Sequence, residues 1–242
     1  MKGVIIGGGL GTRLYPLTHA TNKHLLPVYD RPMVFYPIAT LVNAGITEIL
    51  IVTGGPHAGD YLHVLKNGQG LGVTHLEFAY QEKEGGIAEA LGLAEAFSDK
   101  QKIAVILGDN IFEDHFRSAV EAYAKQEARG AKIFLKEVSD PERFGVPEIV
   151  DGKIIRVDEK PKEPKSRYAV TGLYLYDAHV WEAIHSLKPS GRGELEITDV
   201  NNFYITQGTM TYEILNGWWT DAGTFDTLLR AGNLAMKKVK GK

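Results

Sequence analysis

The sequence predicts an α/β fold, in which helices cover both faces of a largely parallel β-sheet and a second part of mixed strands packs against it. Three observations predict this fold. Short apolar runs alternate with helical patterns in the first half of the chain, and a glycine-rich segment directly follows the first run. The second half changes to strands joined by charged, proline-rich loops. The alternation in the first half is the usual pattern of a parallel sheet with covering helices.

Four short, partly β-branched runs in the first half are expected to form buried strands, separated by helices. The first helix is expected to begin at Asp30 and Pro32 and to end at residues 44–45, because proline favours helix starts and glycine favours helix stops. Two further helices are expected in 86–97 and 115–128, where helix-forming residues or helical spacing of apolar residues occur. The four strands are expected at residues 3–6, 48–53, 76–80 and 103–107.

The second half is expected to contain further strands and one closing helix. Strands are indicated at 131–138, 152–160 and 168–177, and a helix is indicated at about 223–238. No stretch has the composition of a linker, and no internal repeat is present. We therefore expect a single domain over residues 1–242.

Composition excludes several classes of function. The chain has 242 residues, of which 44% are hydrophobic, so it is long enough to bury a sizeable core. A net charge of −3 argues against binding a nucleic-acid polymer, and no apolar run or N-terminal signal indicates a membrane. We expect a cytoplasmic protein. With no cysteine and no metal-like spacing of the eight histidines, a metal is expected on oxygen ligands or an isolated imidazole.

The segment GGGLGTR, residues 7–13, matches neither of two common nucleotide-binding patterns. A dinucleotide fingerprint needs G-x-G-x-x-G, whereas Gly7, Gly9 and Gly11 are spaced by two. A Walker loop ends in G-K-[ST], whereas this loop ends in Thr12 and Arg13. Bare amides followed by a guanidinium are able to hold a phosphate chain. A phosphate loop and a tight turn with a surface arginine are the two interpretations.

Ligands bind at the carboxyl ends of the strands in open parallel sheets. Three such ends are followed by glycine-rich or acidic loops, which begin GGGLGTR, TGGP and LGDN. We expect these loops to meet at one edge. Lys23, ten residues after Arg13, is either a surface lysine or a second cation held against the same phosphates.

Two aspartates are candidate metal ligands. Asp109 follows a strand, where an aspartate caps the next helix as readily as it binds a metal. Asp221 stands in GWWTDAGTF, one of the least surface-like contexts in the chain, where an unpaired charge is costly. Two carboxylates from distant segments suit Mg²⁺, which takes one or two carboxylates together with phosphate oxygens and water.

Two further segments carry candidate ligand contacts. Glu159 and Lys160 end a strand, and they form either a charged loop pair or contacts to hydroxyls and a phosphate. Gln81 follows a strand and precedes Gly85 and Gly86. A glutamine has both donor and acceptor atoms, so it is able to read the edge of a base where glycines permit close approach. A simple turn is the alternative.

Taken together, these segments resemble the sugar nucleotidyltransferase family. The resemblance covers essentially the whole chain and rests on motifs that occur in the family's order. They are GGxGTRLxPLT, KHLLPVYDRPM, LGDNIF, DPERFGV, EKPKEPKSRYAVTGLYLYD, GRGELEITD and WWTDAGT. The resemblance implies a Rossmann-like three-layer sandwich with a mixed central sheet.

The resemblance implies roles for particular residues. The nucleotide-binding residues it implies are Gly8, Gly9, Gly11, Thr12, Arg13, Lys23, Gln81, Gly86 and Asp109. The sugar-phosphate-binding residues it implies are Asn110, Gly145, Glu159, Lys160, Val170, Arg192 and Trp219. The metal ligands it implies are Asp109 and Asp221, both for Mg²⁺. The residues that would act in catalysis are Arg13, Lys23, Asp109, Lys160 and Asp221.

The resemblance also implies substrates and a division of the chain. It implies dTTP and glucose 1-phosphate as substrates, dTDP-glucose and pyrophosphate as products, and a homo-oligomer, either a dimer or a tetramer. The nucleotide-binding part is expected at about 1–112 plus 217–242, and the sugar-phosphate-binding part at about 113–216.

The sequence departs from the family pattern in two places. The usual LAGG opening is IGGG, so that Gly7 replaces an alanine, and we expect a looser loop. The chain continues for only one expected helix beyond WWTDAGT, which resembles a short form without the C-terminal regulatory extension.

Rival functions remain open at this point. A transferase that uses UTP or another nucleotide is the nearest one. A non-catalytic sensor of sugar nucleotides is the alternative from another class, although it would not need both carboxylates and all the cations. A dehydrogenase is disfavoured by the glycine spacing.

Overall fold

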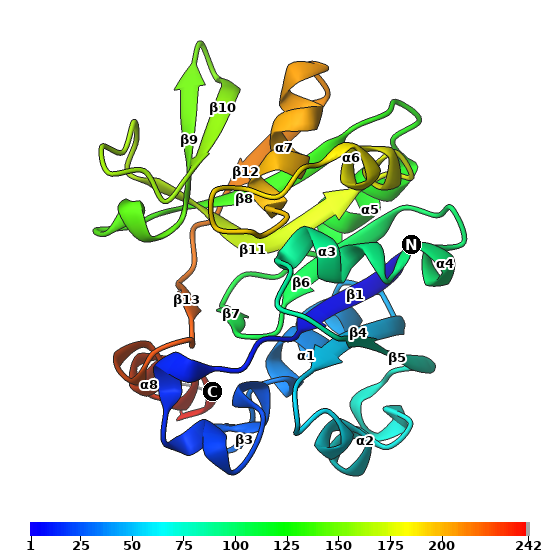
Figure 1. Cartoon of the computed structure of the whole chain (residues 1–242), viewed down its shortest axis with the longest axis vertical. Coiled ribbons are helices and arrows are strands. Elements are labelled where there is room, and N and C mark those ends of the chain that lie inside the picture. The colour runs from blue at the N-terminus through cyan, green and yellow to red at the C-terminus, as the bar shows by residue number, and fades with distance from the viewer. Residues whose placement is uncertain (241–242) are drawn as a thin grey trace.

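A mixed seven-stranded sheet runs through the middle of the protein in the computed structural model, which describes residues 1–240 (Figure 1). The strands are β1 (Lys2–Gly7), β4 (Glu48–Gly54), β5 (His75–Gln81), β6 (Ile103–Leu107), β8 (Ala131–Glu137), β11 (Tyr168–Tyr176) and β12 (Met210–Ile214). Their order is β12-β8-β11-β6-β1-β4-β5. Neighbouring strands are parallel except at β11, which is antiparallel to both β6 and β8.

Each face of the sheet is covered by its own set of helices. Because side chains alternate along a strand, Val4 and Ile6 of β1 join the core on one face and Ile5 joins the core on the other. The first face is covered by α3 (Ile87–Gly92), α4 (Glu95–Ser98), α6 (Val180–Ser186) and α7 (Ile197–Thr206). The second face is covered by α1 (Phe35–Asn43), α2 (Gly59–Leu65) and α5 (Arg117–Lys125). The predicted three-layer α/β sandwich is confirmed.

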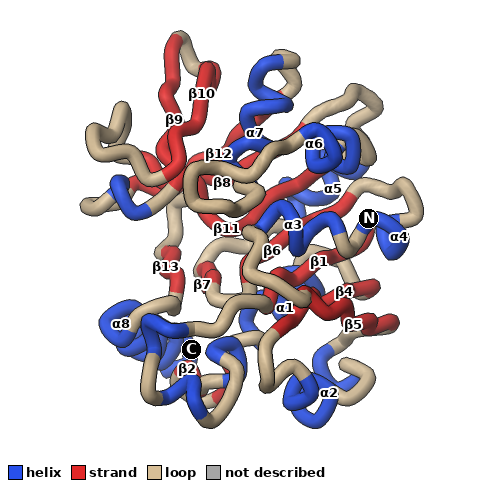
Figure 2. Tube along the Cα trace, viewed as in Figure 1, coloured by secondary structure: helices blue, strands red, loops and turns tan. Residues whose placement is uncertain are grey.

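Three short ribbons and a last helix lie outside the central sheet. The ribbons pair β9 (Gly145–Val150) with β10 (Lys153–Glu159), β7 (Asn110–Phe112) with β13 (Trp219–Asp221), and β2 (Pro27–Val28) with β3 (Arg31–Pro32). The β9–β10 ribbon projects at one end of the molecule (Figure 2, top left). Helix α8 (Phe225–Lys240) packs through Ala231 and Ala235 on a small cluster that contains Val28 and Ile111.

The structure corrects the predicted start of the first helix. Asp30 and Pro32 lie in the turn and second strand of the β2–β3 ribbon, and the Asp30 carboxylate binds Arg31 at 2.7 Å instead of capping a helix. Helix α1 therefore begins at Phe35. It ends as predicted, because Gly45 takes a left-handed φ of 90°. The predicted helix at 86–97 is divided into α3 and α4.

The parallel order explains where a ligand site forms. Strands β1, β4 and β6 are adjacent and parallel, so the loops after them leave from one edge of the sheet. None of the helices in residues 1–240 combines the length and the apolar character needed to cross a membrane. The last two residues of the predicted nucleotide-binding part, 241 and 242, lie outside the described residues.

Candidate active site

Two adjoining cavities of about 440 and 350 Å³ lie at this edge, and every predicted site residue lines at least one of them. Gly8, Arg13 and Lys23 line both. The larger cavity is also lined by Asp109, Asn110, Gly145, Glu159, Lys160, Val170, Arg192, Trp219 and Asp221. The smaller cavity is also lined by Gly9, Gly11, Thr12, Gln81 and Gly86. The TGGP loop does not line either cavity, so only two of the three expected loops form the site.

The glycine loop after β1 is contacted by three other segments of the chain. Gly11 has a left-handed φ of 65°, and its carbonyl accepts a hydrogen bond of 2.9 Å from the Thr18 hydroxyl. A Cβ at Gly11 would lie 3.0 Å from the Cβ of Lys23, so the close approach of these two segments needs a glycine. The Leu10 amide donates to Glu84 Oε1 at 2.8 Å. These contacts hold the loop against the segments that contain Thr18, Lys23 and Glu84.

Gly7 belongs to strand β1 and not to the loop. It pairs with Thr53 of β4, and its carbonyl accepts a hydrogen bond of 3.1 Å from the Tyr61 hydroxyl. A Cβ at Gly7 would lie 2.7 Å from that hydroxyl oxygen. The space of an alanine side chain is thus filled by Tyr61, and the expectation of a looser loop at Gly7 is wrong.

Lys23 and Asp109 form a buried ion pair in the floor of the site. Lys23 Nζ lies 2.7 Å from Asp109 Oδ2, and Asn110 Nδ2 donates to Asp109 Oδ1 at 2.9 Å. Burial alone would raise the pKa of Asp109, but the charge of Lys23 and the two hydrogen bonds hold that pKa well below its usual range. Asp109 is therefore ionised, and it does not act as a helix cap.

A short ribbon brings Asp221 to the same place from the far end of the chain. In the β7–β13 pairing Asp221 lies opposite Asn110, and the Ala222 amide donates to the Asp109 carbonyl at 2.8 Å. A Cβ at Gly223 would lie 3.2 Å from Arg13 Nη2 and 3.5 Å from Asp109 Oδ2. The glycine loop, the end of β6 and the β13 turn therefore converge.

The carboxylate of Asp221 has little positive charge near it to balance its own charge. Burial and the nearby charge of Asp109 raise the pKa of Asp221 to about 6, against which the cations Arg143, Arg13 and Lys23 act weakly. Arg143 Nη2 stands 3.6 Å from Asp221 Oδ1. A partly buried carboxylate that lacks positive charge, next to a second, ionised carboxylate, fits a divalent cation. Within residues 1–240 no cluster of three acidic or histidine side chains is present, so further ligands would have to come from a substrate or water.

The wall of the larger cavity that contains the predicted sugar-phosphate residues is built on β9, β10, β11 and α7. Glu159 Oε2 accepts a hydrogen bond of 2.6 Å from Thr198, and Glu159 Oε1 lies 3.4 Å from Lys160 Nζ. The Arg192 guanidinium donates to both Glu196 oxygens, at 2.8 and 2.9 Å. Val170 and Gly145 supply apolar wall and backbone around this cluster. The ammonium group of Lys160 and the carboxylate oxygens of Glu159 therefore lie side by side.

A hydrogen bond between Asn110 and Trp219 links neighbouring strands, and we call this pair the Asn110–Trp219 clip. Asn110 Oδ1 accepts hydrogen bonds from Trp219 Nε1 at 2.7 Å and from the Gly172 amide at 2.9 Å. Asn110 is 2% exposed, so its carbonyl serves the fold. The clip joins β7, β11 and β13, and Asp109 and Asp221 stand at the ends of the paired strands β7 and β13.

Several residues that line the cavities were not predicted. The acidic side chains of Glu84 and Glu194 face the smaller cavity, and Glu194, Glu196 and Arg143 line the larger one. The motifs GRGELEITD and DPERFGV contain most of them, but only Arg192 and Gly145 were assigned there. Their contribution depends on tertiary contacts, such as the pair between Arg192 and Glu196, that residue type alone does not reveal.

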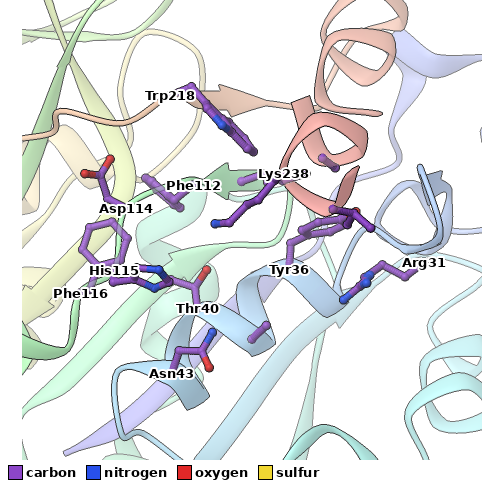
Figure 3. A pocket seen from close by; sticks show the side chains of 14 residues that line it. Arg31, Tyr36, Thr40, Asn43, Phe112, Asp114, His115, Phe116, Trp218 and Lys238 are labelled. Atoms are coloured by element: carbon purple, nitrogen blue, oxygen red, sulfur yellow. The ribbon is translucent and has the colours of Figure 1, made fainter. Parts of the chain in front are cut away.

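A separate groove of about 360 Å³ lies between α1, β7 and α8 (Figure 3). Its lining is mainly apolar and aromatic and includes Tyr36, Phe116 and Trp218, with Lys238 beside them. None of the predicted site residues, all of which fall within residues 1–240, lines this groove. The groove is therefore distinct from the candidate active site.

Comparisons with known proteins agree with this geometry. The family model described as nucleotidyl transferase matches residues 2–238. A curated glucose-1-phosphate thymidylyltransferase of Actinoplanes sp. is 44% identical over 96% of this chain and 77% of its own length. One of Neisseria meningitidis serogroup A is 41% identical over 96% of this chain and 82% of its own length.

Solved structures show the same relationship. A Bacillus anthracis crystal structure, provisionally described as a glucose-1-phosphate thymidylyltransferase in complex with a sucrose, has a TM-score of 0.92 and 54% identity over 97% of this chain and 95% of its own. A UDP-glucose pyrophosphorylase complexed with UDP-glucose has a TM-score of 0.85 and 25% identity over 98% of each chain. The chain belongs to the nucleotidyl transferase family.

Proposed function

We propose that the protein is a glucose-1-phosphate thymidylyltransferase, which joins dTTP and glucose 1-phosphate into dTDP-glucose and releases pyrophosphate. The observation that carries the proposal is the meeting of Asp109 and Asp221 with Arg13, Lys23 and Gly8 of the glycine loop in one cavity. Relatives named for this activity, at 41–44% identity over 96% of the chain, support the choice of reaction.

The reaction needs no nucleophilic side chain. A phosphate oxygen of glucose 1-phosphate attacks the α-phosphorus of dTTP in line, and the bond from that phosphorus to the bridging oxygen of pyrophosphate breaks. Both substrates are anions, so the protein has to bring negative groups together and neutralise them. Arg13, Lys23 and Lys160 are the cations that we assign to this task, and all three line the larger cavity.

The site divides between the two substrates. We assign the triphosphate to the loop formed by Gly8, Gly9, Gly11 and Thr12 together with Arg13 and Lys23, and the base to Gln81 and Gly86, which line the smaller cavity. We assign the sugar phosphate to the larger cavity, where Glu159 and Arg192 suit hydroxyls and Lys160 suits the phosphate. The nucleotide-binding part is accordingly about 1–112 plus 217–242, and the sugar-phosphate part about 113–216.

Asp109 and Asp221 are the residues that would hold Mg²⁺. Bound there, Mg²⁺ would supply positive charge to the phosphate oxygens of both substrates. The unmet charge on Asp221 supports this assignment. The Asn110–Trp219 clip joins the two strands that carry these aspartates at their ends, and both aspartates line the larger cavity.

Uracil is the near rival to thymine. The two bases differ by one methyl group, worth about 1 kcal/mol when buried, so a pocket separates them by roughly 10- to 200-fold at best. The fold likeness to a UDP-glucose pyrophosphorylase keeps UTP as the second candidate nucleotide.

A matrix of nucleoside triphosphates against sugar 1-phosphates, assayed for pyrophosphate with Mg²⁺, tests the proposal. We expect the greatest turnover with dTTP and glucose 1-phosphate. Asp109→Asn and Asp221→Asn should abolish it, whereas the exposed Asp226→Asn on α8 should not. Normal turnover in both site variants would overturn the metal assignment, and faster turnover with UTP would replace the thymidylyl assignment.

A further inference from the structure

The amide of Gln81 has one defined orientation in this structure. Gln81 is the last residue of β5, where it pairs with Gly54 of β4, so its backbone is fixed. Its Nε2 donates to the carboxylate of Glu89 and also to the Gly86 carbonyl, at 3.3 Å for the latter. A carboxylate and a backbone carbonyl accept hydrogen bonds and do not donate them, so the nitrogen of the amide has to face both groups.

The carbonyl oxygen of the same amide consequently faces the smaller cavity. A Cβ at Gly8 would lie 2.6 Å from Gln81 Oε1, and Gly8 and Gln81 both line that cavity. Among the hydrogen bonds within residues 1–240, none is donated to Gln81 Oε1. The cavity therefore presents a hydrogen-bond acceptor at this position and not a donor.

Glu89 is itself held in place. It lies in the first turn of α3, and the Ala88 amide before it donates to the Leu195 carbonyl at 3.1 Å. A Cβ at Gly85 would lie 3.0 Å from Glu89 Cγ, so the side chain packs closely on the preceding loop. Glu89 is half-buried, does not line either cavity and thus acts only through Gln81.

We infer that Glu89 is a positioning residue for base selection, because it fixes the amide of Gln81 with its oxygen toward the base. This inference rests on the proposed function. An acceptor at this position suits an N–H on the pairing edge of the base, which thymine, uracil and guanine carry. Cytosine and adenine carry an unprotonated ring nitrogen there and would face the acceptor with a lone pair. Gln81 thus selects the class of base, and Glu89 sets that selection without touching the nucleotide.

The test measures binding of dTTP and dCTP by calorimetry with Mg²⁺ and without a sugar phosphate. In Glu89→Gln the new amide is able to donate to Gln81 Oε1, so Gln81 can present either end to the base. The ratio of dTTP affinity to dCTP affinity should fall by about tenfold, the contribution of one hydrogen bond. Glu89→Ala, which leaves only the longer contact from Nε2 to the Gly86 carbonyl, should change the ratio in the same direction. Glu121→Gln on the exposed face of α5 makes the same charge change and should leave the ratio unchanged.

A second substitution separates orientation from simple damage. Gln81→Glu in the Glu89→Gln background presents an acceptor in either orientation, so the preference for dTTP should return, although both affinities should fall beside a triphosphate. An unchanged ratio in Glu89→Gln, or no recovery in the double variant, would overturn the inference. A wild-type protein that binds dTTP no better than dCTP would also overturn it.

The binding readout keeps the two proposals apart. Failure of turnover with an intact, Glu89-dependent preference for dTTP would refute the proposed transferase and support the role of Glu89. Normal turnover, with a preference for dTTP that does not depend on Glu89, would support the proposed transferase and refute the role of Glu89.

Discussion

Asp221→Asn should stabilise the metal-free protein while it removes activity. The raised pKa of about 6 means that folding disfavours the ionised form of this carboxylate. The shift from the ordinary value of 3.8 is about 2 pKa units, which corresponds to about 3 kcal/mol at most. The side chain is 18% exposed, and an asparagine would lose the contact with Arg143 at 3.6 Å, so a net gain of about 1–2 kcal/mol is expected.

The gain should depend on pH in a defined direction. Above about pH 7 the carboxylate is ionised in both the folded and the unfolded chain, and its full cost is present in the wild type. As the pH falls through 6 toward 3.8, the folded form takes up its proton first and the cost disappears. The difference between variant and wild type should therefore be largest at pH 7–8 and should approach zero near pH 4.

Thermal unfolding in EDTA at pH 8 and at pH 4 measures this difference. For a chain of this length, 1–2 kcal/mol corresponds to a rise in Tm of about 2–8 °C. Added Mg²⁺ should stabilise the wild type and not the variant, and so should close the gap. A variant that is less stable than the wild type at pH 8 in EDTA would refute the reasoning about the charge of this site.

Two further predictions follow from particular contacts, and a third follows from the family resemblance. Lys23→Met leaves Asp109 buried without its cation and should lower the free energy of unfolding by about 3 kcal/mol at pH 7, measured in urea. The low pKa of Asp109 stabilises the fold only above that pKa, so the difference from the wild type should shrink in acid. A difference that does not depend on pH would contradict this. Gly7→Ala should lower the Tm because its Cβ would stand 2.7 Å from the Tyr61 hydroxyl, and Tyr61→Phe in that background should restore part of the loss; no recovery would show that the hydroxyl is not the cause. The predicted homo-oligomer should appear in light scattering with the mass of a dimer or a tetramer, and a monomer at assay concentration would refute it.

The edge that carries the candidate site could be predicted from sequence because its signals are local. Arg13 follows a glycine loop and Asp109 follows a strand, and the rule that ligands bind at the carboxyl ends of parallel strands predicts that both lie at one edge, where both line the larger cavity. The sequence indicates Asp221 as a candidate metal ligand because an aspartate between tryptophans and a glycine is in a context that is unusual for a surface.

Other features depend on contacts that no local pattern records. Asp30 and Pro32 carry good helix-start signals, yet the pairing of Val28 with Arg31 uses them in a ribbon, and tertiary pairing overrides local preference there. Glu196 and Glu89 have ordinary surface-like sequence contexts. Their contacts with Arg192 and Gln81 form only in the folded chain, so the sequence does not predict them. Strand β12 was missed because its residues alternate in exposure along the edge of the sheet, where little apolar sequence is needed.

The most direct test of the proposed function is ³¹P NMR of the wild-type protein with dTTP, glucose 1-phosphate and Mg²⁺. We predict equal amounts of dTDP-glucose and pyrophosphate, with neither formed by Asp221→Asn. Pyrophosphate accompanied by dTMP would show hydrolysis in place of transfer to the sugar phosphate. Binding of dTDP-glucose with no product formed from the two substrates would identify a sensor, and either result would contradict the account.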